Sequence, residues 1–96
     1  MKLNIKTPML ASQAGTLITH TEKILQQFSK DYTEAAEAEV RFMHGSSQAS
    51  DKVCEIYLKF NGKNMFVIQS ATSFEASATK AVKKLRTQIT KIVPSL

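Results

Sequence analysis

Hydrophobic and polar residues alternate along four segments of the chain, and this alternation predicts four β-strands. In the first segment Leu3 and Ile5 stand between lysine and asparagine residues, which is typical of a short, half-buried strand. Successive side chains of a strand point to opposite faces, so each segment offers one apolar face to a core. The predicted strands cover residues 2–7, 37–44, 53–60 and 63–70.

The last two predicted strands are separated by Asn61-Gly62, the dipeptide best suited to a type I′ hairpin turn. The sequence is compatible with a loop of two residues or of four. Both loop lengths place the same side chains on one face, so the predicted core face does not depend on the choice. In these two strands it consists of Cys54, Ile56, Leu58, Phe60, Met65 and Val67.

Two other segments carry apolar residues at helical spacing and predict amphipathic helices, one from about residue 13 to 31 and one from about 73 to 92. Ser12 is the predicted cap of the first. Thr72 with Glu75, or Ser73 alone, is predicted to cap the second, and Pro94 to end it. The first apolar stripe contains Leu17, Ile18, Thr21, Ile24, Leu25, Phe28 and Tyr32. The second contains Phe74, Ala78, Ala81, Leu85, Ile89 and Ile92.

The predicted order of elements is therefore β-α-β-β-β-α, in one domain over residues 1–96. A helix that connects the first two strands predicts that they are parallel neighbours. The remaining strands follow one another as an antiparallel meander. Two helices with one apolar stripe each fit one face of the sheet, which predicts an α+β, two-layer sandwich with a four-stranded mixed sheet.

Cysteine content and hydropathy indicate a protein of the cytoplasm. Cys54 is the only cysteine, so no disulfide can form within the chain, which fits a reducing compartment. The start of the chain lacks the apolar run of a secretion signal, and no segment approaches the roughly 18 apolar residues of a membrane span. We therefore expect a cytoplasmic protein with no membrane partner.

The sequence gives little support to an enzyme, so we expect no catalytic residues, no metal site and no cofactor. His20 and His44 belong to no recognisable pattern with a nucleophile, and Cys54 falls on the predicted core face, where cysteine acts as a small hydrophobe. The scattered glycines form no phosphate-binding loop. The acidic residues near the end of the first helix lack metal-ligand spacing and are expected to solvate a turn: Asp31, Glu34, Glu37 and Glu39.

The net charge of +5 is concentrated in the second half of the chain. Residues 1–48 carry five basic and five acidic side chains, whereas residues 49–96 carry eight basic and three acidic ones. Such asymmetry favours a polyanionic partner, most often a nucleic acid.

The second helix holds most of this excess. At 100° per residue, Lys80, Lys84 and Lys91 fall within about 40° of one another, beside Thr87. Lys83 extends the band towards solvent, and Arg86 lies near the opposite edge of the apolar stripe. No acidic residue four positions away relieves the repulsion between the lysines. Helix geometry alone allows both a phosphate-binding surface and a solvated face.

Four apolar side chains are predicted on the sheet face that points away from the core: Val53, Tyr57, Phe66 and Ile68. We call them the open-face cluster. Simple cross-strand packing is the first explanation, a protein contact or weak self-association is the second, and stacking on nucleic-acid bases is the third.

The chain resembles the ribosome hibernation-promoting factors, also called ribosome-associated inhibitor A or sigma-54 modulation proteins. The likeness rests on the order of elements and on short collinear segments. These are "MKLNI", "EKIL" in the first helix, "AEV" in the second strand, the Asn-Gly hairpin and the closing "SFEASATKAVKKLRTQITK". The resemblance extends over essentially the whole chain.

The resemblance implies a fold similar to double-stranded-RNA-binding domains and a translation inhibitor of stationary phase and stress. Such proteins bind the small ribosomal subunit and its ribosomal RNA, where they occlude the positions of messenger RNA and transfer RNA. By position, Lys84, Arg86 and Lys91 match basic sites that face ribosomal RNA, and Lys80 and Lys83 add to them. The resemblance also implies a short form without the additional C-terminal domain of longer members.

Overall fold

The computed structural model describes residues 1–10, 12–46 and 51–92 and confirms the predicted order of elements. The fold is α+β, with four strands and two helices. The elements are β1 (Lys2–Lys6), α1 (Gly15–Asp31), β2 (Ala35–His44), β3 (Lys52–Phe60), β4 (Lys63–Ala71) and α2 (Phe74–Ile92).

The strands form one mixed sheet in the order β1-β2-β3-β4. β1 pairs with β2 in parallel, as predicted for strands joined through a helix, with Lys2 opposite Glu37 and Ile5 opposite Val40. β2, β3 and β4 are antiparallel neighbours. A register shift between Ala35 and Glu37 marks an irregularity where β2 begins.

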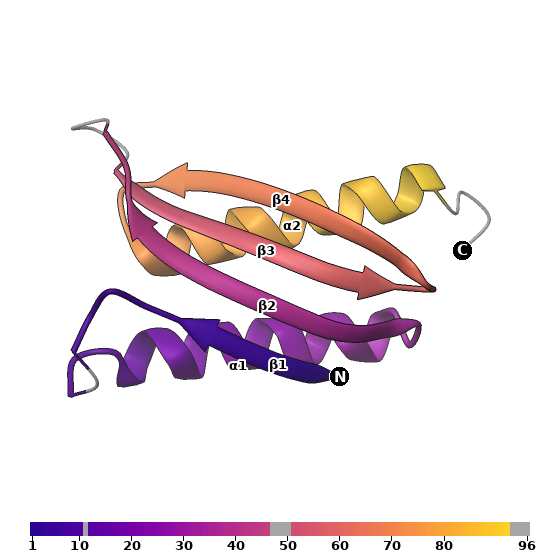
Figure 1. Cartoon of the computed structure of the whole chain (residues 1–96), viewed down its shortest axis with the longest axis horizontal. Coiled ribbons are helices and arrows are strands. Elements are labelled where there is room, and N and C mark those ends of the chain that lie inside the picture. Colours follow the sequence, from indigo (N-terminus) through magenta and orange to yellow (C-terminus); the bar gives the residue numbers. More distant parts are fainter. Residues whose placement is uncertain (11, 47–50, 93–96) are drawn as a thin grey trace.

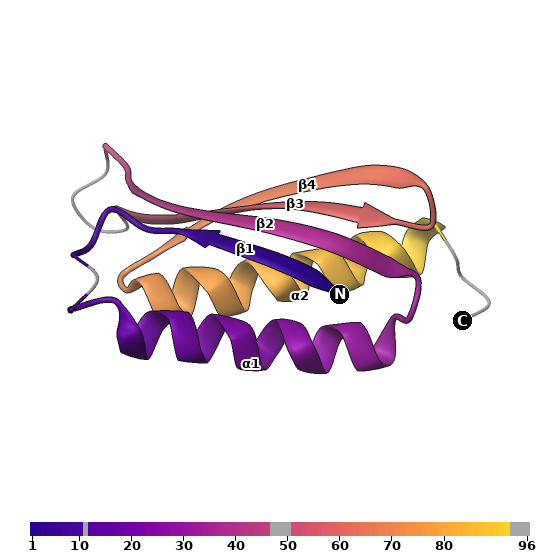
Figure 2. The same cartoon turned by 60° about the horizontal axis from the view of Figure 1, so that its bottom comes forward.

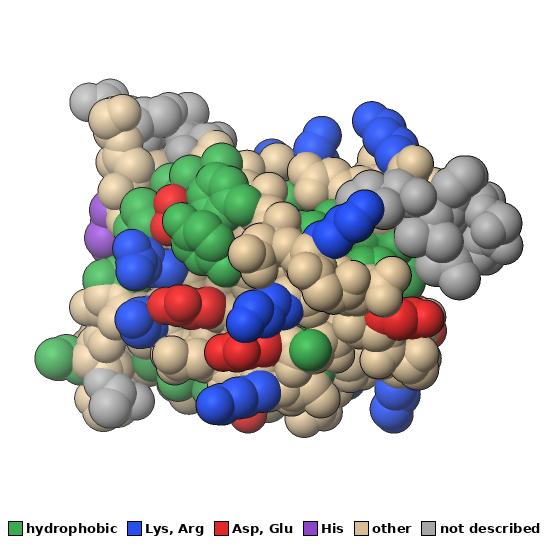
Figure 3. Space-filling model, turned by 45° about the vertical axis from the view of Figure 1, so that its right-hand side comes forward, with side chains coloured by type: hydrophobic (Ala, Val, Ile, Leu, Met, Phe, Trp, Pro, Cys, Tyr) green, Lys and Arg blue, Asp and Glu red, His purple; other side chains and the backbone are tan. Residues whose placement is uncertain are grey.

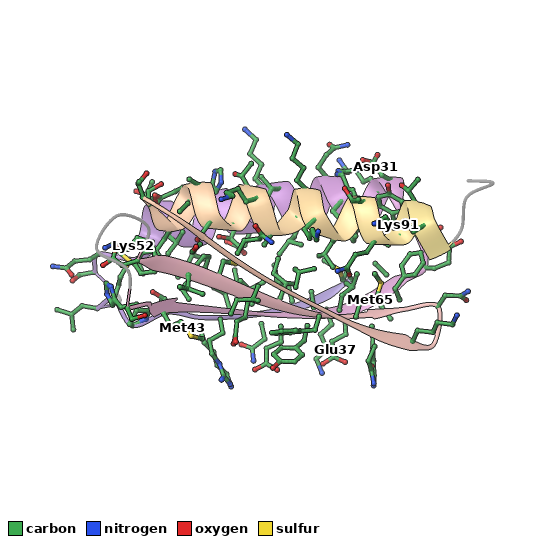
Figure 4. The ribbon with its side chains drawn as sticks, turned by 90° about the horizontal axis from the view of Figure 1, so that it is seen from above. Asp31, Glu37, Met43, Lys52, Met65 and Lys91 are labelled. Carbon is green, nitrogen blue, oxygen red and sulfur yellow. The ribbon has the colours of Figure 1, made fainter. Side chains whose placement is uncertain are left out.

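The molecule has two layers, because both helices lie on the same face of the sheet (Figures 1 and 2). α2 packs against β3 and β4 and also contacts α1. No helix or strand of residues 1–10, 12–46 and 51–92 covers the other face of the sheet. Met65 points from the sheet towards the helices, whereas Glu37 points away from them (Figure 4).

The β3–β4 hairpin has the two-residue loop expected for Asn-Gly. Asn61 and Gly62 both have positive φ angles, 51° and 77°, and Phe60 pairs directly with Lys63. The backbone N–H of Asn61 also donates a hydrogen bond of 3.1 Å to the carbonyl of Glu34. The hairpin turn is thereby attached to the connection between α1 and β2.

The core forms between the helices and the inner face of the sheet, and the alternation of the sequence is reproduced there. Every predicted core residue of the hairpin is buried, as are Ala38, Val40 and Phe42 of β2. The helices contribute Leu17, Leu25, Phe28, Ala78, Ala81, Leu85 and Ile89. Val82 and Ser77 are also buried, although the predicted stripe omitted them. The side chain of Ile92, which the stripe included, lies outside the described residues.

The predicted cap of the first helix is wrong. α1 begins at Gly15 and its cap position is Ala14, which makes no side-chain hydrogen bond. Ser12 lies before the helix, in a turn in which the N–H of Gln13 donates to the carbonyl of Leu10 at 2.8 Å. Ala14 is fully buried, so its packing fixes the start of the helix in place of a polar cap.

The observed segment boundaries differ slightly from the predicted ones. β2 begins at Ala35 and β3 at Lys52, each slightly before its predicted start. In the loop between β2 and β3, the N–H of Gly45 donates to the carbonyl of Asp51 at 2.6 Å. Residues 47–50 of that loop, and Pro94, lie outside the described residues.

Candidate nucleic-acid interface

α2 begins with a side-chain cap, which fixes where its basic residues lie. The Ser73 hydroxyl oxygen accepts a hydrogen bond of 3.1 Å from the N–H of Ala76. Ser73 is thus the observed cap, one of the two alternatives that the sequence offered. Because small buried residues such as Ala78 and Ala81 face the sheet, the opposite side of the helix is turned towards solvent.

Three of the predicted lysines come together along one flank of α2. Lys80, Lys83 and Lys84 line a groove of about 250 Å³ with Thr87 and with Gln69 of β4. We call this the basic groove. All three lysine side chains are exposed, as the helical spacing predicted. Gln69 was not predicted from the sequence as part of this site. Its side chain lies on the same face of β4 as Met65 and Val67, and a polar residue on that face of an edge strand indicates contact with solvent.

Lys80 is held against the sheet by a specific contact. Its Nζ donates a hydrogen bond of 2.8 Å to the backbone carbonyl of Ser70 in β4. One lysine of the groove is therefore oriented before any ligand arrives. Such orientation reduces the side-chain entropy that binding must cost.

The basic groove carries positive charge without an acidic counterpart close by. Within residues 1–10, 12–46 and 51–92, no ion pair includes Lys80, Lys83 or Lys84. Adjacent ammonium groups repel one another, and a phosphate placed between them would relieve that repulsion. The groove is thus suited to an anionic ligand.

Lys91 is exposed near the end of α2 and is not among the residues that line the groove. Figure 4 shows it far along the helix, near the end of the molecule where Asp31 also lies. It extends the positive charge of the flank beyond the groove.

Arg86 occupies the other flank of α2 and is engaged with α1. Its Nη1 lies 2.8 Å from Oδ2 of Asp31. Its guanidinium carbon lies 5.5 Å from the ring centroids of both Phe28 and Tyr32. These contacts attach α2 to the end of α1. The predicted contact of Arg86 with RNA stays a prediction, and the structure gives this side chain a role in the fold.

The open-face cluster lies where the sequence placed it. Tyr57, Phe66 and Ile68 are 48%, 42% and 48% exposed, and Val53 is half-buried. The rings of Tyr57 and Phe66 pack with centroids 4.6 Å apart at 38°. Figure 3 shows hydrophobic side chains gathered beside acidic and basic ones on this face. A depression of about 440 Å³ lies next to the ring pair, bordered by Glu37, Glu39, Lys59 and Asn64.

The cysteine and histidine side chains, which most often carry catalytic chemistry, do not line the basic groove. Burial raises the pKa of the Cys54 thiol to about 12, and the nearby carboxylate of Glu55 adds to the effect. The thiol is therefore protonated and shielded at neutral pH. His20 is hydrogen-bonded to Thr79 across the two helices at 3.1 Å. Among the described residues, no cluster of three His, Cys, Asp or Glu side chains is suited to a metal ion.

A family model described as Sigma 54 modulation protein / S30EA ribosomal protein matches residues 10–93. The chain belongs to this family. The resemblance seen in the sequence is thereby confirmed, and membership indicates a ribosome-associated protein. No helix in the part of the chain that the structure describes is long and apolar enough to cross a membrane.

Solved structures share the fold of this family member. A ribosomal subunit interface protein from Coxiella burnetii matches with a TM-score of 0.79 and 19% identity, over 99% of this chain and 100% of that one. The N-terminal domain of Protein Y from Thermus thermophilus matches with a TM-score of 0.75 and 19% identity, over 96% of this chain and 99% of that one. No curated protein sequence matches the chain.

Proposed function

We propose that this protein is a cytoplasmic hibernation factor that binds the small ribosomal subunit and occludes the positions of messenger RNA and transfer RNA. The observation that carries the proposal is the basic groove, which three lysines line on a chain of a ribosomal protein family. Inhibition would be steric. It would require no cofactor and no catalytic group, and it would serve cells in stationary phase or stress.

Phosphate groups of ribosomal RNA are the proposed ligands of the groove. Lys80, Lys83 and Lys84 would each displace a condensed counterion, and Lys91 would contact a phosphate further along the same flank. We assign Arg86 a smaller contribution to binding because it already pairs with Asp31. Affinity should therefore fall steeply as the salt concentration rises.

Sedimentation of a stationary-phase lysate through a sucrose gradient tests the proposal. We expect the protein in the small-subunit and ribosome fractions at low salt and its release at high salt. Changing Lys80, Lys84 and Lys91 together to Glu should abolish co-sedimentation, with an unchanged circular dichroism spectrum. If the wild-type protein is absent from the ribosomal fractions at low salt, the proposal is wrong.

A protein-interaction module that uses the open-face cluster, for another protein or for self-association, is the second candidate function. The exposure of Tyr57, Phe66 and Ile68 favours it, because neighbouring apolar side chains at a surface often mark a protein contact. It predicts a solution mass that rises with concentration, responds to Tyr57→Lys and changes little with salt. A constant monomeric mass in analytical ultracentrifugation, with no partner recovered in a pull-down, would exclude this function.

A further inference from the structure

β4 is the last strand of the sheet, and among the described residues no strand pairs with its outer edge. It has nine residues, whereas the strand at the opposite edge, β1, has five. Figure 1 shows β4 along one margin of the sheet, with α2 beneath it. A long open edge presents backbone groups that can pair with another chain.

The hairpin fixes which backbone groups of β4 point outward. In a two-residue hairpin the flanking pair, here Phe60 and Lys63, exchanges both backbone hydrogen bonds, and bonded pairs then alternate along the ladder. The N–H and C=O groups of Asn64, Phe66 and Ile68 therefore face away from β3. Ser70 follows the same phase, and its outward carbonyl is the one that Lys80 contacts.

The two sides of this edge differ in chemistry. On the open face of the sheet, Phe66 and Ile68 expose apolar surface. On the helix side lies the basic groove, with Gln69 from β4 and Lys80, Lys83 and Lys84 from α2. A strand added at the edge would place alternate side chains on these two surfaces.

We propose that the β4 edge binds an extended peptide of another protein in which apolar and acidic residues alternate. The peptide backbone would pair with Asn64, Phe66 and Ile68 as a fifth strand. Its apolar side chains would cover Phe66 and Ile68, and its carboxylates would enter the basic groove. The main-chain bonds supply affinity, and the alternation supplies specificity.

Charge and hydrogen bonding favour this occupant over others. Pairing of β4 with β4 of a second copy would bring two basic grooves together, and their lysines would repel. RNA can neutralise the lysines, but it lacks the row of amide donors and acceptors at strand spacing that the edge offers.

The proposal has a regulatory consequence that rests on the proposed function. The carboxylates of the peptide and the phosphates of ribosomal RNA would use the same lysines, so the two partners would exclude one another. A protein that carries such a segment would release this chain from the ribosome.

The direct test is titration of the full ¹⁵N-labelled chain with a capped seven-residue peptide of alternating Glu and Val. We expect slower hydrogen exchange of the Phe66 and Ile68 amides, since both would gain an acceptor. A peptide of the same composition with Glu and Val in separate blocks, and one of alternating Lys and Val, should each bind at least about tenfold more weakly. Equal binding of the blocked peptide would overturn the proposal.

Variants of one residue isolate the backbone contribution. Ile68→Pro removes an outward N–H without removing a bond to β3, which an edge strand tolerates. It should weaken the peptide at least about tenfold, whereas Ile68→Val, which keeps the N–H, should stay within about twofold. Lys83→Glu should also weaken binding, and Lys23→Glu on α1 serves as its matched control. Unchanged affinity in Ile68→Pro, with a native spectrum, would overturn the proposal.

Sedimentation of the same proteins with ribosomes separates this proposal from the proposed function. Ile68→Pro should co-sediment like the wild type. Co-sedimentation without peptide binding would overturn the inference alone, and peptide binding without co-sedimentation would overturn the proposed function alone. If a single-stranded RNA, and not the peptide, protects the Phe66 and Ile68 amides, the edge binds nucleic acid and the peptide proposal is wrong.

Discussion

The two flanks of α2 carry basic side chains in opposite surroundings. Arg86 is bound to Asp31 and lies over two aromatic rings of α1 and the segment that follows it. Lys80, Lys83 and Lys84 line a groove at the edge of the sheet, where ion pairs with other described residues do not occupy them. On one flank the positive charge connects α2 to α1 within the fold. On the other flank the positive charge is exposed, and this is the flank that we propose binds a partner.

The largest effect should come from reversing charge on the lysine flank. If the proposed function is right, we expect Lys80→Glu with Lys84→Glu to lower the affinity for the small subunit by about a hundredfold, because two proposed phosphate contacts would become repulsive. The slope of log affinity against log salt should fall by about two in a filter-binding assay. The matched control is Lys23→Glu with Lys30→Glu, exposed lysines of α1, which should change affinity by less than about threefold. An equal loss of affinity in the control would show that the lysines of α2 contribute no more to binding than those of α1.

Arg86→Ala should have the next largest effect. It should lower the stability of the fold and leave ribosome binding nearly unchanged. The ion pair is partly exposed, with side chains 35% and 43% accessible, so the pair itself contributes little. Loss of the contacts with the rings of Phe28 and Tyr32 adds to the loss of stability. We expect the free energy of unfolding to fall by about 1 kcal/mol, measured by urea denaturation. Ribosome affinity should change by less than about threefold, and a loss as large as that of the lysine variants would show that both flanks bind RNA.

Asp31→Asn should cost less than Arg86→Ala, about 0.5 kcal/mol. It removes the charge of the acceptor but leaves the guanidinium over the aromatic rings. A double-mutant cycle with Arg86→Ala measures the coupling between the two side chains. A coupling energy of zero would mean that the aromatic contacts alone hold Arg86.

Lys91→Gln should have the smallest effect, about a twofold loss of ribosome affinity. The residue lies on the lysine flank but not in the basic groove. Comparison with Lys84→Gln in the same assay measures how much the neighbouring charges of the groove contribute. If the two variants lose affinity equally, the position of Lys84 in the groove contributes nothing extra.

Local patterns predicted most of the fold because they report burial directly. The alternation around Ile56 and Val67 and the Asn-Gly turn defined the sheet, and helical spacing placed Lys80 beside Lys84. Contacts between distant segments have no such local signal. The pairing of Arg86 with Asp31 joins positions that are far apart in the chain.

The basic groove also depends on contacts between distant segments. The spacing of lysines on a helix predicts a charged flank, but the contribution of Gln69 and the contact with the Ser70 carbonyl depend on how α2 packs against β4. The wrong cap at Ser12 has a related cause, since the buried position of Ala14 outweighed a local capping preference.

The parallel pairing of β1 with β2 has a consequence for the order of folding. Lys2 pairs with Glu37 across a long connection that includes the whole of α1, whereas short connections join β2 to β3 and β3 to β4. Closing this long connection costs conformational entropy before the contacts between β1 and β2 can compensate for it. We expect the antiparallel meander with α2 to form first and β1 to dock last. The half-buried Leu3 and Ile5 would then be among the first side chains to detach when the native state opens.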